Sequence, residues 1–129
     1  YSVTFFDIFS TKAKQFGFVM ELDGGESLCC CGDEPLYEAN ENYARGCKWL
    51  LHEAFCLEDE ADKFKPFEKN HTTVERACKK AEEMGVENLV LYHSEDSRPE
   101  TRKEIYTAAG KPYYSGNLYV PEDMESLSL

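Results

Sequence analysis

The sequence has no apolar run that approaches the ~20 residues needed to span a bilayer. It has only three histidines and a single tryptophan. Its first residue is Tyr1 rather than methionine, and no charged-then-apolar leader segment follows. We therefore expect a cytoplasmic protein without membrane contact. The missing methionine predicts that processing or trimming has removed residues upstream.

The cysteines lack the spacing of a metal knuckle, because no two of the six are separated in the C-x-x-C manner. Cys29, Cys30 and Cys31 are adjacent, and neighbours on a strand point to opposite faces. The other three stand singly in apolar surroundings. We predict reduced thiols that pack as small hydrophobes. A cysteine-based metal or redox protein is the alternative that the adjacent triplet leaves open.

Positive charge is also scarce, since 25 acidic residues outnumber 14 basic ones and give a net charge of -11. Such a field repels a phosphate-rich polymer, so it favours a small substrate and weighs against general RNA binding. It does not exclude a metal site. With 129 residues, 42% of them hydrophobic and 30% charged, the chain is long enough for one folded domain and too apolar to be disordered.

Hydrophobic periodicity and turn residues predict an α/β protein. An N-terminal group of strands, two of them joined by the hairpin signal Asp23-Gly24-Gly25, is followed by alternating helices and strands. This order indicates a mixed sheet with covering helices. The predicted strands are 3–8, 16–22, 27–31, 47–51, 89–91, 117–120 and 126–129. The predicted helices are 35–44, closed by Gly46, then 74–84, closed by Gly85, and one from Ser97 or Pro99 to 109. The charged segment 58–69 is predicted to be a loop that contains a turn of helix.

Residues of the kind that bind metals follow three predicted strands. Asp33 follows the third strand, His52 and Glu53 the fourth, and His93 the fifth, while His71 precedes the clearest helix. Ligand and catalytic groups of α/β sheets gather beyond the carboxyl ends of strands. Metal catalysis needs imidazole and carboxylate groups that converge there. Each residue also has a structural interpretation, as a turn residue, a core histidine or a helix cap.

Four short motifs, taken together, resemble one known family. Gly32-Asp33, His52-Glu53-Ala54-Phe55, His71-Thr72-Thr73 and Tyr92-His93-Ser94 occur in this order. They are similar to the G-D-T, H-E-A-T, H-S/T-T and T-H-F-S segments in the second half of ribonuclease Z-like metallo-β-lactamase-fold hydrolases. The resemblance implies that residues 1–129 form a single domain, the C-terminal half of a metallo-β-lactamase αββα sandwich.

The resemblance also implies a role for each matching residue. Asp33 matches an aspartate that bridges two metal ions, and His93 matches the last histidine ligand. His71 matches a histidine that gives a proton to the leaving group, and Glu53 matches the glutamate that holds its ring. His52 is expected to be structural. The implied metal is zinc, two ions in a complete enzyme, with manganese or iron possible.

Departures from the family pattern matter for activity. The H-x-H-x-D-H segment and a further ligand histidine are absent, Glu34 replaces the threonine after Asp33, and Glu95-Asp96 departs from T-H-F-S. We therefore expect a partial metal site, inactive alone, that requires the missing N-terminal half or self-association through an uncovered sheet face. The expected substrate is a small phosphodiester or ester, with nucleic acid left open. The alternative is a non-enzymatic α/β protein-interaction domain.

Overall fold

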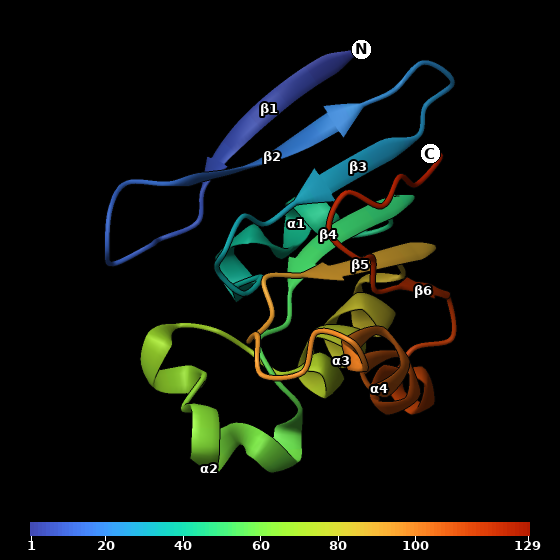
Figure 1. The fold of residues 1–129 in the computed structure, drawn as a ribbon. Coiled ribbons are helices and arrows are strands. Elements are labelled where there is room, and N and C mark those ends of the chain that lie inside the picture. Colours follow the sequence, from blue (N-terminus) through green and yellow to red (C-terminus); the bar gives the residue numbers. More distant parts are fainter.

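Six strands form one sheet in which neighbours along the chain are also neighbours in the sheet. The computed structural model describes residues 1–129, and the strand order is β1-β2-β3-β4-β5-β6 (Figure 1). The first three strands pair antiparallel, whereas β3 to β6 run parallel, which confirms the predicted mixed sheet. The strands are β1 (Ser2–Asp7), β2 (Phe16–Glu21), β3 (Ser27–Cys30), β4 (Trp49–Glu53), β5 (Asn88–Tyr92) and β6 (Asn117–Tyr119).

The turn between β2 and β3 is the hairpin that the sequence predicts. The backbone N–H of Leu22 donates to the carbonyl oxygen of Glu26 at 2.8 Å. Gly24 and Gly25 have φ angles of 98° and 84°, a region that L-residues with a Cβ rarely adopt. Two consecutive glycines therefore allow the chain to reverse here without strain.

Helices cover one face of the sheet. Figure 1 shows α3 and α4 side by side against the parallel strands, with α2 beyond the end of β4. No helix is long and apolar enough to cross a membrane. The α-helices are α1 (Glu41–Ala44), α2 (Ala61–Phe64), α3 (Val74–Met84) and α4 (Arg102–Gly110); 3₁₀ turns occur at Glu38–Asn40, Glu58–Glu60, Phe67–Lys69 and Lys111–Tyr113.

Helix α3 is the element that the sequence predicts most accurately. The hydroxyl of Thr73 accepts a hydrogen bond from the backbone N–H of Arg76 and caps the first turn. The helix ends at Gly85, whose φ is 68°. Its apolar face packs into the main core, and all five predicted members are buried: Val74, Ala77, Cys78, Ala81 and Met84.

The opposite face of the sheet carries a second, smaller apolar cluster. Leu28, Trp49 and Val90 are buried there, and Leu127 of the C-terminal segment packs over them. On β1, Phe5 remains 69% exposed. The predicted open face is thus covered over its centre by the chain's own C-terminal segment, while the part formed by β1 and β2 remains open (Figure 1).

Several predicted boundaries were wrong. Residues 126–129 form no strand, because Leu127 packs onto the sheet face instead of pairing with an edge. The helix predicted from Pro35 begins only at residue 38, as a 3₁₀ turn. Its predicted end is right, since Gly46 follows the C-cap, Arg45, with a φ of 70°. Helix α4 begins at Arg102, since residues 97–101 form bends and turns.

Two further predictions about the middle of the chain need correction. Segment 58–69 contains more helix than the single turn predicted within a loop, namely a short α-helix and two 3₁₀ turns. Strand β4 extends through His52 and Glu53 because both pair with β5. These two residues therefore belong to the strand itself rather than to the loop beyond it. All six cysteines are free thiols, and five of them are buried.

Candidate metal centre

The candidate site lies at the edge where the three central strands end. Asp33 lies three residues beyond the end of β3, Glu53 is the last residue of β4, and His93 follows β5 directly. His71 comes from the segment just before α3. Strands β3, β4 and β5 are adjacent and parallel, so their carboxyl ends meet at one edge.

Three of the four predicted site residues converge closely. One ligand atom each from Glu53, His71 and His93 lies within 4.8 Å of the other two. Glu53 and His71 are buried, at 0% and 6% exposure, whereas His93 is exposed. The Nδ1 atom of His71 lies 3.6 Å from the Oε2 atom of Glu53, too far for a hydrogen bond. Neither atom has another partner.

Burial disfavours the charged forms of both Glu53 and His71. Burial raises the pKa of Glu53 to about 9, with the charges of Glu34 and Asp33 adding to the effect and the N–H of Thr72 opposing it. Burial also lowers the pKa of His71, and the nearby His93 and Lys12 lower it further. Both pKa shifts therefore oppose an ion pair between the two side chains, although their facing atoms lie only 3.6 Å apart.

These two groups fit a metal ion. A cation between them favours the ionised carboxylate and the neutral imidazole, which are the forms that bind metals. It also supplies a partner for two buried polar atoms that otherwise have none. The other carboxylate oxygen of Glu53 is already fixed, because the backbone N–H of Thr72 donates to it at 2.6 Å.

Asp33 lies next to this group but is not one of the three. One of its carboxylate oxygens, Oδ1, is buried without a hydrogen-bond partner. Its charge acts on the pKa values of both Glu53 and His71. The turn that carries it is tied to β5, since the hydroxyl of Tyr92 donates to the carbonyl oxygen of Gly32.

His52 is a structural residue, in agreement with its expected role. Its Nε2 accepts a hydrogen bond from the backbone N–H of Leu36 at 2.9 Å, so its Nδ1 carries the proton and donates to the carbonyl oxygen of Glu53 at 2.7 Å. Burial lowers the pKa of His52 to about 4, which keeps the ring neutral. The ring ties the segment after Asp33 to β4.

Phe55 forms an aromatic wall that the sequence did not reveal. Its ring stacks on His71 with centroids 5.1 Å apart and lies 6.4 Å from the ring of His93. The two histidine rings are 4.7 Å apart. Phe55 stands where the related motif has threonine, so the substitution in H-E-A-T was the available signal. An apolar wall beside a cation strengthens its electrostatic interactions.

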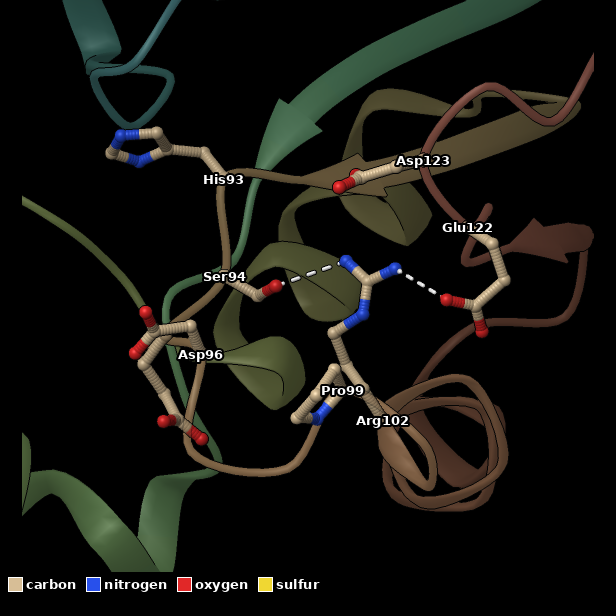
Figure 2. Close-up of a pocket in the computed structure, with 8 residues that line it drawn as sticks. His93, Ser94, Asp96, Pro99, Arg102, Glu122 and Asp123 are labelled. Carbon is tan, nitrogen blue, oxygen red and sulfur yellow. Dashed lines mark hydrogen bonds and ion pairs between the residues drawn. The ribbon is translucent and has the colours of Figure 1, made fainter.

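A pocket opens beside His93 (Figure 2). Arg102 of α4 projects into it and donates hydrogen bonds to Ser94, to the carbonyl oxygen of Pro121 and to Glu122. Neither Asp96 nor Asp123 forms an ion pair. The pocket is therefore acidic overall. It is lined by His93, Ser94, Glu95, Asp96, Pro99, Arg102, Glu122 and Asp123.

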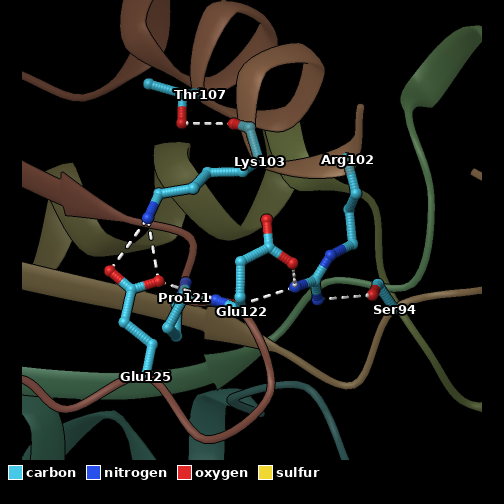
Figure 3. A network of polar contacts seen from close by, with 7 residues as sticks. All are labelled: Ser94, Arg102, Lys103, Thr107, Pro121, Glu122 and Glu125. Atoms are coloured by element: carbon cyan, nitrogen blue, oxygen red, sulfur yellow. Dashed lines mark hydrogen bonds and ion pairs between the residues drawn. The ribbon is translucent and has the colours of Figure 1, made fainter. Parts of the chain in front are cut away.

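The C-terminal wall of this pocket is fastened to α4 by two cations (Figure 3). Arg102 holds Pro121 and Glu122, and Lys103 binds both carboxylate oxygens of Glu125 at 2.8 Å. Sequence analysis missed the pocket because Glu122 and Asp123, which complete it, lie between the two predicted terminal strands, and no local pattern placed them against α4. The closely spaced acids at 95–96 and 122–123 were the only local signal.

The geometry is that of a metallo-β-lactamase fold, and comparisons with solved structures agree. The metallo-β-lactamase fold protein YhfI from Bacillus subtilis superimposes with a TM-score of 0.72 at 15% identity, over 93% of this chain and 46% of that protein. The short form of human tRNase Z superimposes with a TM-score of 0.68 at 20% identity, over 98% of this chain and 41% of that protein. The chain has the metallo-β-lactamase fold.

Sequence comparison points in the same direction. Ribonuclease Z of Synechococcus sp. (strain CC9605) is 39% identical over 69 residues, which are 54% of this chain and 21% of that protein. Ribonuclease Z of Prochlorococcus marinus (strain MIT 9313) is 38% identical over the same extent. No family profile matches the chain. The resemblance to ribonuclease Z-like proteins is thus confirmed, and the chain spans less than half the length of these relatives.

Proposed function

We propose that this chain supplies part of the active site of a metal-dependent hydrolase that cleaves phosphodiesters or esters. The observation that carries the proposal is that Glu53 and His93, at the ends of two strands, converge with His71, just before α3, in a metallo-β-lactamase fold. Two of these side chains have buried polar atoms without partners. An interior of this kind is costly unless a cation or substrate completes it.

In this proposal Asp33 and His93 hold the metal, which when bound supplies a water-derived nucleophile at neutral pH. His71 exchanges a proton with the leaving oxygen through Nε2, because its Nδ1 faces Glu53. Glu53 is held by the N–H of Thr72 and keeps the ring oriented. Phe55 limits the rotation of the imidazole by stacking on it.

The metal site that this chain contributes is incomplete. A catalytic zinc site usually has three protein ligands. Of the metal ligands that the related family uses, this chain contains only the counterparts Asp33 and His93. We propose that residues 1–129 correspond to the C-terminal half of the domain and are inactive alone. The missing ligands would come from an N-terminal half, in the same or a second polypeptide. The open part of the sheet face, with Phe5 and Phe16 exposed, supports docking of that half or self-association.

A small substrate is favoured over a polyanion. The pocket beside His93 contains four carboxylates and one guanidinium, and that guanidinium already binds Glu122. The net charge of the chain, -11, acts in the same direction. Transfer RNA, suggested by the names of the relatives, would have to be bound mainly by parts of the protein outside this chain.

A protein-interaction domain without metal is the second candidate, and the exposed Phe5 favours it. Hydrolysis of bis(p-nitrophenyl) phosphate, with zinc or manganese added, separates the two. We expect no turnover by the 129-residue chain and turnover when it is co-expressed with the upstream half, lost in Asp33→Ala and His93→Ala. Turnover by the chain alone would refute the proposed incompleteness. No turnover and no metal in the assembled protein would leave only the interaction domain.

A further inference from the structure

We infer that Glu53, His71 and His93 form a complete site for one divalent transition-metal ion within this chain, an alternative to the Asp33–His93 pair. The inference shares His93 with the proposed function but assigns two other residues to metal binding. Two histidines and one carboxylate, with a position left open, are the ligand set of many mononuclear zinc and iron sites. The three side chains are contributed by separate segments of the chain.

The distance between the buried atoms Nδ1 of His71 and Oε2 of Glu53 matches the distance between two ligand atoms on one metal ion. Ligands about 2.1 Å from zinc at tetrahedral angles lie about 3.4 Å from each other. The Nδ1 atom of His71 and the Oε2 atom of Glu53 are 3.6 Å apart. The separation is too long for a hydrogen bond and close to that of two ligands on a shared ion.

The burial of these two atoms points to an absent partner. Glu53 is 0% exposed and His71 is 6% exposed, and the facing atoms of both have no hydrogen bond. Buried polar atoms in proteins nearly always have one. A single ion bound between them satisfies both atoms together.

Two ligands are fixed and the third can adapt. The backbone of Glu53 pairs with Tyr92 in the sheet, and its Oε1 accepts from Thr72. His71 stacks on Phe55, and its backbone N–H donates to the carbonyl oxygen of Pro66 at 2.9 Å. His93 is exposed and stands at the free end of β5, so its ring can close onto an ion held by the other two.

Occupation of this site excludes the proton-transfer role of Glu53 and His71. With a metal on Nδ1 of His71, Glu53 no longer orients the ring toward a substrate. The chain alone would thus be metal-loaded yet inactive. Activity would require the ion to bind instead at the cluster that contains Asp33.

Cobalt titration of the 129-residue chain tests the inference, with visible absorption and calorimetry as readouts. We expect one cobalt ion per chain. The variants Glu53→Gln, His71→Gln and His93→Gln should each lose cobalt affinity. The loss should exceed the roughly 10- to 100-fold cost of removing a residue that only orients a ligand. Asp33→Asn is the matched control: it removes a nearby charge but no ligand of this site, and should weaken cobalt binding less than any of the three ligand variants. Circular dichroism and thermal melting of each metal-free variant verify folding, and the exposed His93 gives one ligand variant whose folding is not at risk.

The outcome pattern separates this inference from the proposed function. Loss of cobalt binding in Asp33→Asn and His93→Gln, with binding by Glu53→Gln unaffected, would overturn the inference and leave the proposed function standing. Loss of cobalt binding in Glu53→Gln and His93→Gln, with a smaller effect in Asp33→Asn, supports it. Absence of cobalt binding by a folded wild-type chain would overturn it as well, without bearing on a site completed by an upstream half.

Discussion

The hydroxyl of Tyr92 donates a hydrogen bond to the carbonyl oxygen of Gly32, so a side chain of β5 reaches the turn that follows β3. Strand β4 lies between these two strands. Tyr92 precedes His93, and Gly32 precedes Asp33. One hydrogen bond therefore ties together the two turns that carry the proposed metal ligands.

Tyr92→Phe should weaken this connection. Removal of the hydroxyl leaves the Gly32 carbonyl without its phenol donor, and we expect a loss of about 1 kcal/mol in the free energy of unfolding. Urea unfolding measures it. Tyr113→Phe is the control, because that ring is 41% exposed. Equal stability of the two variants would show that the Tyr92 bond contributes nothing.

Glu53→Gln should become more stable relative to the wild type as the pH rises, in the absence of metal. Burial raises the pKa of Glu53 from 4.5 to about 9. The folded chain therefore keeps a proton that the unfolded chain releases. The wild type is fully stabilised below pH 4.5 and loses this stability as the pH rises through 9, whereas glutamine does not titrate.

Urea unfolding in a chelating buffer, at about pH 5 and about pH 8, measures this difference, which should grow by at most about 1.4 kcal/mol per pH unit. The metal-free condition matters because a bound cation favours the ionised carboxylate. A difference that stays constant with pH would mean that Glu53 is already ionised in the fold.

His52→Phe should destabilise the chain most at neutral pH. The variant leaves the Leu36 N–H without its acceptor, at a cost of about 1–3 kcal/mol. Burial lowers the pKa of His52 from 6.5 to about 4, so the wild-type contribution is complete above pH 6.5 and is lost as the pH falls toward 4. Unfolding curves at both ends of this range should show the deficit shrinking in acid; a pH-independent deficit would contradict the assignment.

Thr73→Ala removes the cap of α3, the helix that directly follows His71. The threonine hydroxyl accepts a hydrogen bond from the backbone N–H of Arg76 and donates one to Glu58. We expect the variant to lose about 1 kcal/mol in the free energy of unfolding. Thr107→Ala within α4 is the control and should be neutral or slightly stabilising, because alanine is the better helix former. Thermal melting compares the two, and a control that loses as much would rule out a specific capping effect.

Asp96→Asn with Asp123→Asn should favour anionic substrates in the assembled enzyme. Neutralising two unpaired pocket acids should raise kcat/KM for bis(p-nitrophenyl) phosphate by about threefold or more at low salt, and by less at high salt. The neutral p-nitrophenyl acetate should respond little. Asp59→Asn, outside the pocket, controls for total charge. An equal gain in that control would show that the pocket itself is not selective.

Local sequence patterns predicted the convergence of site residues but not their surroundings. Glu53 and His93 could be predicted to meet, with Asp33 beside them, because neighbouring parallel strands end at one edge. Phe55 and the pocket could not, since the path of residues 121–129 depends on Arg102 and Lys103 of α4. The wrong strand at 126–129 has the same cause: a short pattern of alternating residues does not specify a pairing partner.

The coincidence of chain order and sheet order has a consequence for folding. Each strand after the first is added to an edge that is already present, and none has to be inserted between two earlier ones. The hairpins of β1, β2 and β3 need only local contacts, which form fast. The sheet can therefore assemble vectorially during synthesis, and the strand that leads to Asp33 can pair with β2 before the helix that follows His71 has been translated.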